Sequence, residues 1–99
     1  MAKPIFWSPL SVNDFSKILD YLNFHWDENV VRHFIDVTES NLEQISINPR
    51  QYPIIYRKKK IRKCVLTKHN SLFYMESKTQ IDILRIYDTR QDPDNLIFK

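Results

Sequence analysis

The chain of 99 residues contains no glycine. Glycine supplies the left-handed backbone conformations of tight turns, and it lets backbone amides approach a phosphate group closely. Turns in this chain must therefore use Asn, Asp, Ser and Pro, and Asn70 in the sequence KHNS is the best candidate for a positive φ angle. Phosphate-binding loops and dinucleotide-binding fingerprints both require glycine, so enzymes of those types are excluded.

The first part of the chain predicts one short strand and one helix. Residues 3–8, KPIFWS, are rich in β-forming residues, and Pro9 stops the run. Apolar residues then recur at three- and four-residue intervals as far as Trp26. This spacing predicts an amphipathic helix that is capped by Ser11 or Asn13.

A second helix is predicted directly after the first. Asp27 is placed to cap it, and the pair Asn48 and Pro49 ends it. Only the sequence HWDE separates the two periodic segments, so the helices are expected to form a hairpin. One face of the second helix carries Val30, Val31, Phe34, Ile35, Leu42 and Ile45.

Three β-type runs follow, at residues 61–68, 71–75 and 81–87. They are separated by HN and ESKTQ, which are hairpin-length connections, so they predict an antiparallel meander. The last run is apolar on both alternations, which indicates a position inside the sheet. The prediction is an α+β fold of order β-α-α-β-β-β, with the helical hairpin packed on one face of a small, mainly antiparallel four-stranded sheet.

Composition indicates one domain over residues 1–99, since a chain of this length that is 42% apolar can bury a core without staples. Cys64 is the only cysteine, which forbids an internal disulfide and is expected in a reducing compartment such as the cytoplasm. No apolar run approaches a membrane span, and a signal-peptide core is not found. We expect no metal and no cofactor, because no His or Cys pair has ligand spacing.

Positive charge is concentrated in one part of the sequence. Residues 44–75 carry eight basic groups and no acidic group, whereas residues 1–43 carry three basic and seven acidic groups. Such a block is usually a solvated face, or a charged strand edge that discourages pairing, but it also suits phosphate or an acidic protein partner. The basic candidates for binding are Arg57, Lys58, Lys59, Lys60, Arg62, Lys63 and Lys68.

The order of elements and the sequence RKCVLTKHNSLFY…IDILRIYDTRQDP resemble the RelE/ParE superfamily of toxins from type II toxin-antitoxin systems, often described as plasmid stabilization proteins. The similarity covers nearly the whole chain and is most specific in the C-terminal half. It implies a cytoplasmic toxin that inhibits growth and that a cognate antitoxin neutralises in a hetero-oligomer. It also implies that the basic residues, with Tyr87, contact the target or the antitoxin.

Two mechanisms are known in this superfamily. ParE-like proteins bind DNA gyrase and stall it on cleaved DNA without being enzymes, whereas RelE-like proteins enter the ribosome and cleave mRNA by attack of a ribose 2′-hydroxyl. The ribonuclease branch places an arginine in the preceding hairpin strand, where this chain has Ser71 and Leu72. It also uses a tyrosine or histidine near the C-terminus, where this chain reads NLIFK. Both departures favour the ParE-like branch, with the ribonuclease as the alternative.

Three residues are catalytic candidates if the chain is a ribonuclease. Arg90 matches the arginine that follows the last strand and contacts the phosphate in that branch. Arg85 shares a strand face with Tyr87 by the two-residue period. His69, in the hairpin loop, has the chemistry of a general base. The competing interpretations are an ion pair between Arg90 and a neighbouring aspartate, and a simple turn side chain at His69.

A third possibility lies outside the toxins, as a small basic RNA-binding domain. The common RNA-binding modules carry glycine-containing signatures, which this chain lacks. Its aromatic residues also fall mostly at core-periodic positions. Both observations count against this alternative.

Overall fold

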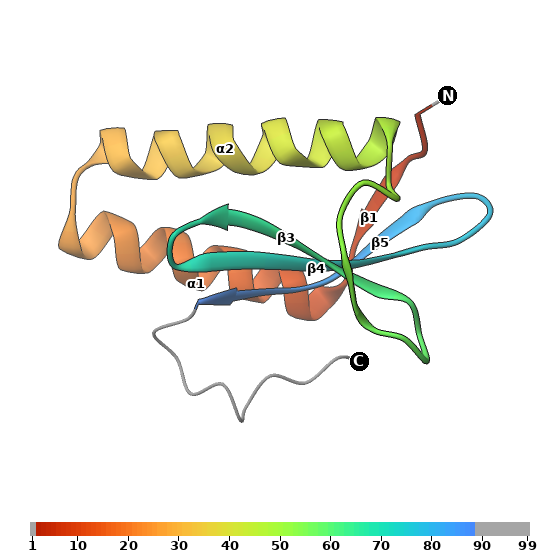
Figure 1. The fold of residues 1–99 in the computed structure, drawn as a ribbon. Coiled ribbons are helices and arrows are strands. Elements are labelled where there is room, and N and C mark those ends of the chain that lie inside the picture. The colour runs from red at the N-terminus through yellow and green to blue at the C-terminus, as the bar shows by residue number, and fades with distance from the viewer. Residues whose placement is uncertain (1, 89–99) are drawn as a thin grey trace.

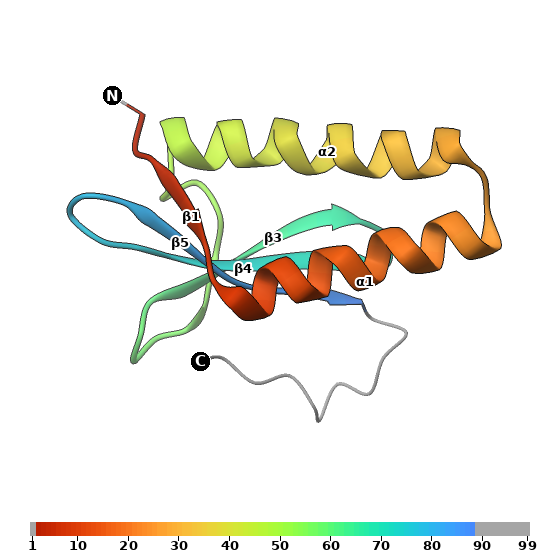
Figure 2. The same ribbon diagram turned by 180° about the vertical axis from the view of Figure 1, so that it is seen from behind.

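The structure is a computed structural model, and it describes residues 2–88 of the chain. Both helices lie on one side of a five-stranded sheet of order β1-β5-β4-β3-β2 (Figures 1 and 2). The elements along the chain are β1 (Ile5–Trp7), α1 (Pro9–His25), α2 (Glu28–Ile47), β2 (Ile54–Tyr56), β3 (Ile61–Thr67), β4 (Asn70–Glu76) and β5 (Ile81–Asp88).

The sheet is mixed, and its last strand lies in its interior. β5 pairs in parallel with β1, through Ile5 with Ile81 and Trp7 with Ile83, and antiparallel with β4 on its other side. The strands β2, β3 and β4 form an antiparallel meander. The predicted α+β class, the helical hairpin on one face and the interior position of the last strand are therefore confirmed.

The predicted number of strands, four, is wrong because the segment predicted as a loop contains a fifth strand, β2. β2 has only three residues, Ile54–Tyr56, and it follows Pro53 directly. It pairs with β3 through Ile54 and Arg62, and the register shifts before Tyr56. A strand this short shows no readable alternation, and the preceding proline is typical of a loop, so sequence periodicity could not find it.

The two helices begin at polar capping residues. The cap of α1 is Ser8, not Ser11 or Asn13 as predicted, and the Ser8 hydroxyl accepts a hydrogen bond from the Ser11 amide at 3.0 Å. Pro9 then occupies the first turn, where its missing N–H costs nothing. The predicted cap of α2 is confirmed, since the Asp27 carboxylate accepts from the amide of Val30 at 3.1 Å.

The core lies between the helices and the sheet. Phe15 of α1 links the layers, because its ring lies 5.3 Å from that of Trp7 in β1 and 5.7 Å from that of Phe34 in α2. Burial of each large apolar side chain stabilises the fold by about 1.5–3 kcal/mol. The buried cluster comprises Ile18, Phe34, Ile45, Cys64, Leu66, Leu72, Tyr74, Ile81, Ile83 and Ile86.

A bulge in β5 explains why its apolar residues do not alternate regularly. Tyr74 of β4 pairs with Ile83, but the next residue of β4, Phe73, pairs with Arg85. Leu84 is therefore the extra residue, and such a bulge bends the strand and re-aims its side chains. As a result, Ile83 and Ile86 both join the helix-facing core although they are three positions apart.

β1 pairs only with the first part of β5, Ile81 to Ile83. The rest of that edge of β5 is covered by the start of α1. The Ser8 amide donates to the carbonyl of Ile83 at 3.0 Å, and the Ser8 hydroxyl donates to that of Leu84 at 2.8 Å. Six residues later, in α1, Asp14 accepts from the Ile86 amide at 3.1 Å. We call this hydrogen-bonded boundary the β5 edge. Its main-chain groups are satisfied by α1 where a neighbouring strand is missing.

Candidate functional site

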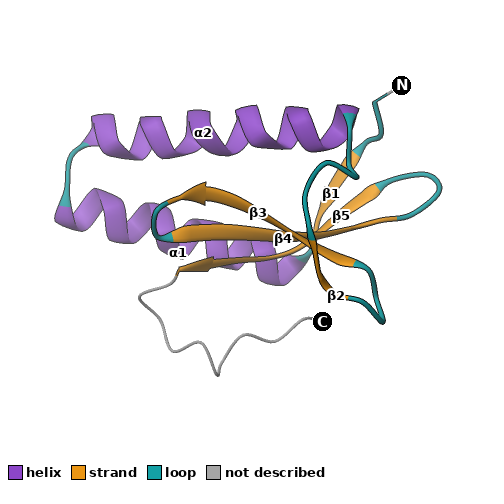
Figure 3. Cartoon of the chain, in the orientation of Figure 1, coloured by secondary structure: helices purple, strands orange, loops and turns teal. Residues whose placement is uncertain are grey.

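A basic cleft of about 730 Å³ lies at the end of the sheet where β3 begins and β4 ends. The β2–β3 and β4–β5 connections both project from this end, as Figure 3 shows. Five of the eight lining residues are cationic and one is a carboxylate. The cleft is lined by Lys3, Arg50, Ile54, Lys60, Arg62, Glu76, Ser77 and Lys78.

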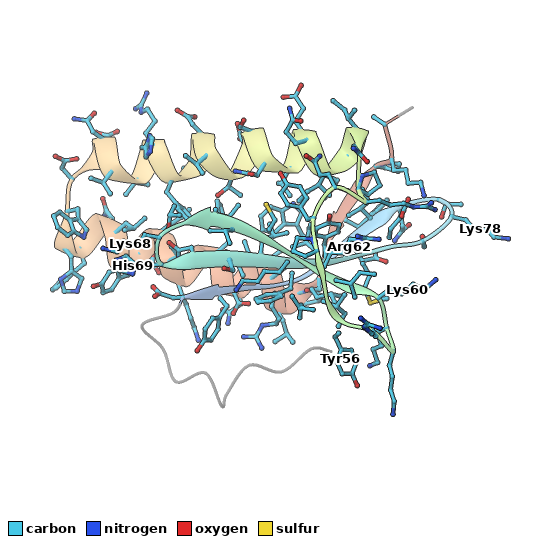
Figure 4. All side chains as sticks on the ribbon, viewed as in Figure 1. Tyr56, Lys60, Arg62, Lys68, His69 and Lys78 are labelled. Carbon is cyan, nitrogen blue, oxygen red and sulfur yellow. The ribbon has the colours of Figure 1, made fainter. Side chains whose placement is uncertain are left out.

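Strand pairing brings these residues together from distant parts of the sequence. Arg62 pairs with Tyr74, so the start of β3 lies beside the end of β4. Lys78 follows β4 in the turn to β5, and Figure 4 shows it at the same end of the molecule as Lys60 and Arg62. Lys3 precedes β1, and its amide donates to the carbonyl of Ser46 in α2 at 3.1 Å.

Glu76 neutralises two of the five cations in the cleft. Its carboxylate accepts from the Lys3 ammonium at 2.7 Å and from the Arg50 guanidinium at 3.2 Å. The Lys3 ammonium also donates to the carbonyl of Ser77 at 2.7 Å. The hydrogen bond from Lys3 is the main cause that holds the pKa of Glu76 below its usual value, against the opposing effect of burial, and Arg50 adds to it.

The other three cations in the cleft have no counter-ion among residues 2–88. Arg62 donates through one guanidinium nitrogen to the carbonyls of Tyr52 at 2.7 Å and Arg50 at 3.3 Å, which are neutral acceptors. In the same described range, no hydrogen bond or ion pair joins the ammonium groups of Lys60 and Lys78 to an acceptor. Within the part of the chain that the structure describes, the cleft therefore keeps three uncompensated positive charges.

The loop that carries Arg50 is anchored to the core. The buried Tyr74 hydroxyl donates to the carbonyl of Pro49, and the Tyr52 hydroxyl lies 3.4 Å from the amide oxygen of Asn41 in α2. Burial is the main cause that raises the pKa of both tyrosines, so they remain neutral hydrogen-bond donors. This anchoring positions Arg50 at the wall of the cleft.

Beside the cleft, residues 57–60 form the exposed turn between β2 and β3, which we call the basic turn. The Lys60 amide donates to the carbonyl of Arg57 at 3.3 Å. Lys60 has a φ of 53° and is the one non-glycine residue with positive φ in the described chain. The prediction of a positive φ at Asn70 is therefore wrong; Asn70 is the first residue of β4, and its side chain accepts from the Thr67 hydroxyl.

The other basic candidates lie elsewhere on β3. Lys63 lies on the opposite strand face from Arg62 by alternation, and its amide donates to the carbonyl of Pro53 at 3.0 Å. Lys68 and His69 are exposed in the β3–β4 turn. The seven residues of β3, roughly 23 Å long, separate that turn from the basic cleft (Figure 4). The structure therefore does not bring His69 together with the cationic cluster.

Arg85 is held in a paired arrangement with α1. Its guanidinium donates to both carboxylate oxygens of Asp14, at 2.7 and 2.9 Å, and these hydrogen bonds raise the pKa of Arg85. Arg85 and Tyr87 pair with Phe73 and Ser71 of β4, so the prediction that they share a face is confirmed. Arg90 lies outside the described residues.

Neither a metal-binding cluster nor a membrane-spanning helix occurs within the described range. No three His, Cys, Asp or Glu side chains there are grouped as metal ligands. Neither of the two helices is long and apolar enough to cross a membrane. Cys64 is a buried free thiol, and burial is the main cause that raises its pKa.

Sequence reasoning missed Lys3, Arg50, Lys78 and Glu76 as parts of the basic cleft. A signal for two of them was present, because a tight turn after Thr67 implies that Glu76 and Lys78 lie beside the start of β3. The hairpin register could not predict that Lys3 lies in the cleft. Its position depends on the parallel pairing of β1 with β5, which no local pattern indicates.

Comparisons with known proteins identify the family of the chain and agree with its fold. Residues 5–93 match the family model described as the ParE toxin of the type II toxin-antitoxin system, parDE. Two solved structures share the fold. A chromosomal ParDE toxin-antitoxin system from P. aeruginosa aligns with a TM-score of 0.74 at 15% identity, over 88% of this chain and 96% of that one. A copper-bound mutant toxin from Helicobacter pylori aligns with a TM-score of 0.56 at 20% identity, over 91% and 97% respectively. No curated protein matches the chain.

Proposed function

This chain belongs to the ParE toxin family of type II toxin-antitoxin systems, and from that membership we propose that it acts in the cytoplasm on DNA gyrase. A cognate antitoxin binds the toxin and neutralises it in a hetero-oligomer. The match over residues 5–93 is the observation that carries this proposal, since it includes both helices and the whole sheet.

Two features of the site favour a non-enzymatic toxin over an mRNA endonuclease. Arg85 is paired through two hydrogen bonds with Asp14, so its charge is already compensated. His69 lies at the opposite end of β3 from the basic cleft. A ribonuclease needs a proton-transfer group within hydrogen-bond reach of the ribose hydroxyl while cations contact the phosphate. Among the described residues no histidine lines the cleft, and its one carboxylate, Glu76, is a weak base because its ion pairs with Lys3 and Arg50 lower its pKa.

A basic surface of this size suits protein docking. The basic turn is fully exposed, and the cleft beside it keeps three uncompensated cations. Complementary charge speeds the encounter of two proteins and selects among partners. The antitoxin and gyrase are the two partners that this surface is proposed to meet.

The target is tested with the purified full chain in two assays. We expect it to inhibit supercoiling of a relaxed plasmid by DNA gyrase, and to leave mRNA intact in a translation reaction that contains ribosomes. The physical reason is that residues 2–88 show no complete acid-base arrangement at the cleft, and such an arrangement typically contributes about 10²–10⁴-fold to the rate of cleavage. Codon-phased cleavage that Arg90→Ala abolishes, with unaffected gyrase, would establish the RelE-like alternative.

The antitoxin relationship is tested in growing cells. Induction of the toxin alone should reduce colony counts, and co-expression of the small protein encoded beside it should restore growth and lead to copurification. A toxin that neither arrests growth nor copurifies with a neighbouring protein contradicts the proposal.

A further inference from the structure

We propose that the basic cleft is a receptor for a short acidic segment of a partner protein, which places two or three carboxylates against Lys60, Arg62 and Lys78. The inference rests on the proposed function only in naming the antitoxin as the protein that carries this segment. The chemistry of the cleft can be tested without that identification.

The charge arrangement of the cleft is the first argument. Five cations line one hollow, and the single carboxylate, Glu76, compensates only Lys3 and Arg50. Like charges held in one concave surface raise the electrostatic potential there and attract anions. Lys60, Arg62 and Lys78 are therefore available to a ligand with about as many negative charges.

The composition of the wall favours a peptide over a nucleic acid. Sites for single-stranded nucleic acid combine cations with aromatic rings on which bases stack. None of the described residues that line this cleft is aromatic, whereas Ile54, which is 40% exposed, offers an aliphatic contact. An extended peptide that alternates acidic with aliphatic residues fits this combination of cations and an apolar side chain.

Glu76 shows how the cleft receives a carboxylate. One of its oxygens accepts from the ammonium of Lys3 and the other from the guanidinium of Arg50, so the same chemistry is already present inside the cleft. Glu76 is consequently a competitor of any acidic ligand. Its removal would leave Lys3 and Arg50 free for the ligand, and the affinity for an acidic peptide should rise.

The basic turn lies next to the cleft and assists the encounter. Lys60 belongs to both, and the other three exposed cations of the turn, Arg57, Lys58 and Lys59, extend the positive surface beyond the cleft walls. Exposed charges of this kind act mainly on the association rate, and salt screens them over about 10 Å at 0.1 M. Binding of the acidic segment should therefore weaken steeply as salt is added.

The test measures binding of a fluorescein-labelled synthetic peptide of alternating Glu and Leu to the full chain by fluorescence anisotropy at low salt. An exposed ion pair typically corresponds to about a threefold change in affinity. Lys78→Gln should weaken binding about threefold, and Glu76→Gln should tighten it about threefold, because the two substitutions change the cleft charge in opposite directions. Lys68→Gln removes the same charge at the other end of β3 and should leave affinity unchanged.

Three results would overturn the proposal. Equal weakening by Lys68→Gln and Lys78→Gln would indicate attraction to the net charge alone. Unchanged affinity in Glu76→Gln would show that the ligand does not enter the cleft. Tighter binding of a single-stranded DNA oligonucleotide of the same charge, with the same dependence on Lys78, would assign the cleft to nucleic acid. Circular dichroism confirms that each variant is folded. Because neither gyrase nor antitoxin is present, these results are independent of those in the growth and supercoiling assays.

Discussion

The two edges of the sheet differ in how the rest of the chain contacts them. At the β5 edge, α1 supplies hydrogen bonds from Ser8 and Asp14, and Arg85 is paired with a carboxylate. At the opposite side, β2 is exposed over its whole length and is followed by four exposed cations. Compensated charge at the β5 edge holds two elements together, whereas uncompensated charge near β2 is available to a partner.

The same residue types therefore have different roles at the two sides. Arg85 donates to a carboxylate in its own chain, so it stabilises the contact between β5 and α1. Arg62 donates to carbonyl groups, which orient its side chain without neutralising its charge. A sequence shows both simply as arginines in strands. The identity of the acceptor decides which of them belongs to the fold and which to the surface that binds.

The largest expected effect comes from breaking the β5 edge. Asp14→Ala should lower the free energy of unfolding by about 3 kcal/mol, because it removes the carboxylate that accepts two hydrogen bonds from the Arg85 guanidinium and one from the Ile86 amide. Both side chains of the pair are less than one-fifth exposed. Urea denaturation measures the change. Asp20→Ala, at an exposed position of the same helix, should change stability by less than about 0.5 kcal/mol. An equal loss in the two variants would contradict this role of Asp14.

A smaller effect of opposite sign is expected at the basic turn. Lys60→Gly should raise the free energy of unfolding by up to about 1 kcal/mol, because a side chain costs free energy at a φ of 53° and glycine does not. Lys59→Gly is the matched control, since that residue does not have a positive φ, and it should be neutral or slightly destabilising. Stability in urea and peptide affinity should then move in opposite directions in Lys60→Gly. A loss of stability in this variant would contradict the prediction.

The smallest effect concerns pH and the ion pairs of Glu76. Its pKa is lower in the folded chain than the ordinary value of 4.5, so its contribution to stability is complete above that value. The contribution disappears as pH falls from about 4.5 through the folded pKa. Wild type should exceed Glu76→Gln by roughly 0.5 kcal/mol at pH 7 and by nothing in strong acid. Thermal unfolding across this range measures the difference. A difference that persists in strong acid would show that the ion pairs are not its source.

Sequence patterns were sufficient to predict the helices and strands in which apolar residues recur with a clear period. The recurrence of apolar residues around Phe15, Ile18 and Leu22 indicates α1, and alternation with tight connections indicates the three strands of the meander. Asp27 was correctly identified as a cap because its position before an apolar period is specific. These signals are local, and local signals survive in the folded chain when they agree with the packing.

The features that the sequence did not predict depend on contacts between residues that are far apart in the chain. The short strand β2 exists because β3 lies beside it, and its own three residues carry no pattern. Asn70 has a strong preference for turns, but strand pairing and the hydrogen bond from Thr67 hold it in β4. The positive φ occurs instead at Lys60, in a turn whose residues, Arg and Lys, have no particular preference for turns. For the same reason, only two of the five cations that line the basic cleft, Lys60 and Arg62, were among the predicted binding residues.

The parallel pairing of β1 with β5 also has a consequence for synthesis. The first strand of the chain finds its neighbour only in the last, and β5 separates β1 from the rest of the sheet. While the C-terminal strand is still inside the ribosome, the nascent chain cannot complete its sheet, and α1 has no β5 edge to cover. Domains fold as units during translation, at about 5–20 residues per second. The described sheet can therefore close only after β5 has been synthesised and has left the ribosome.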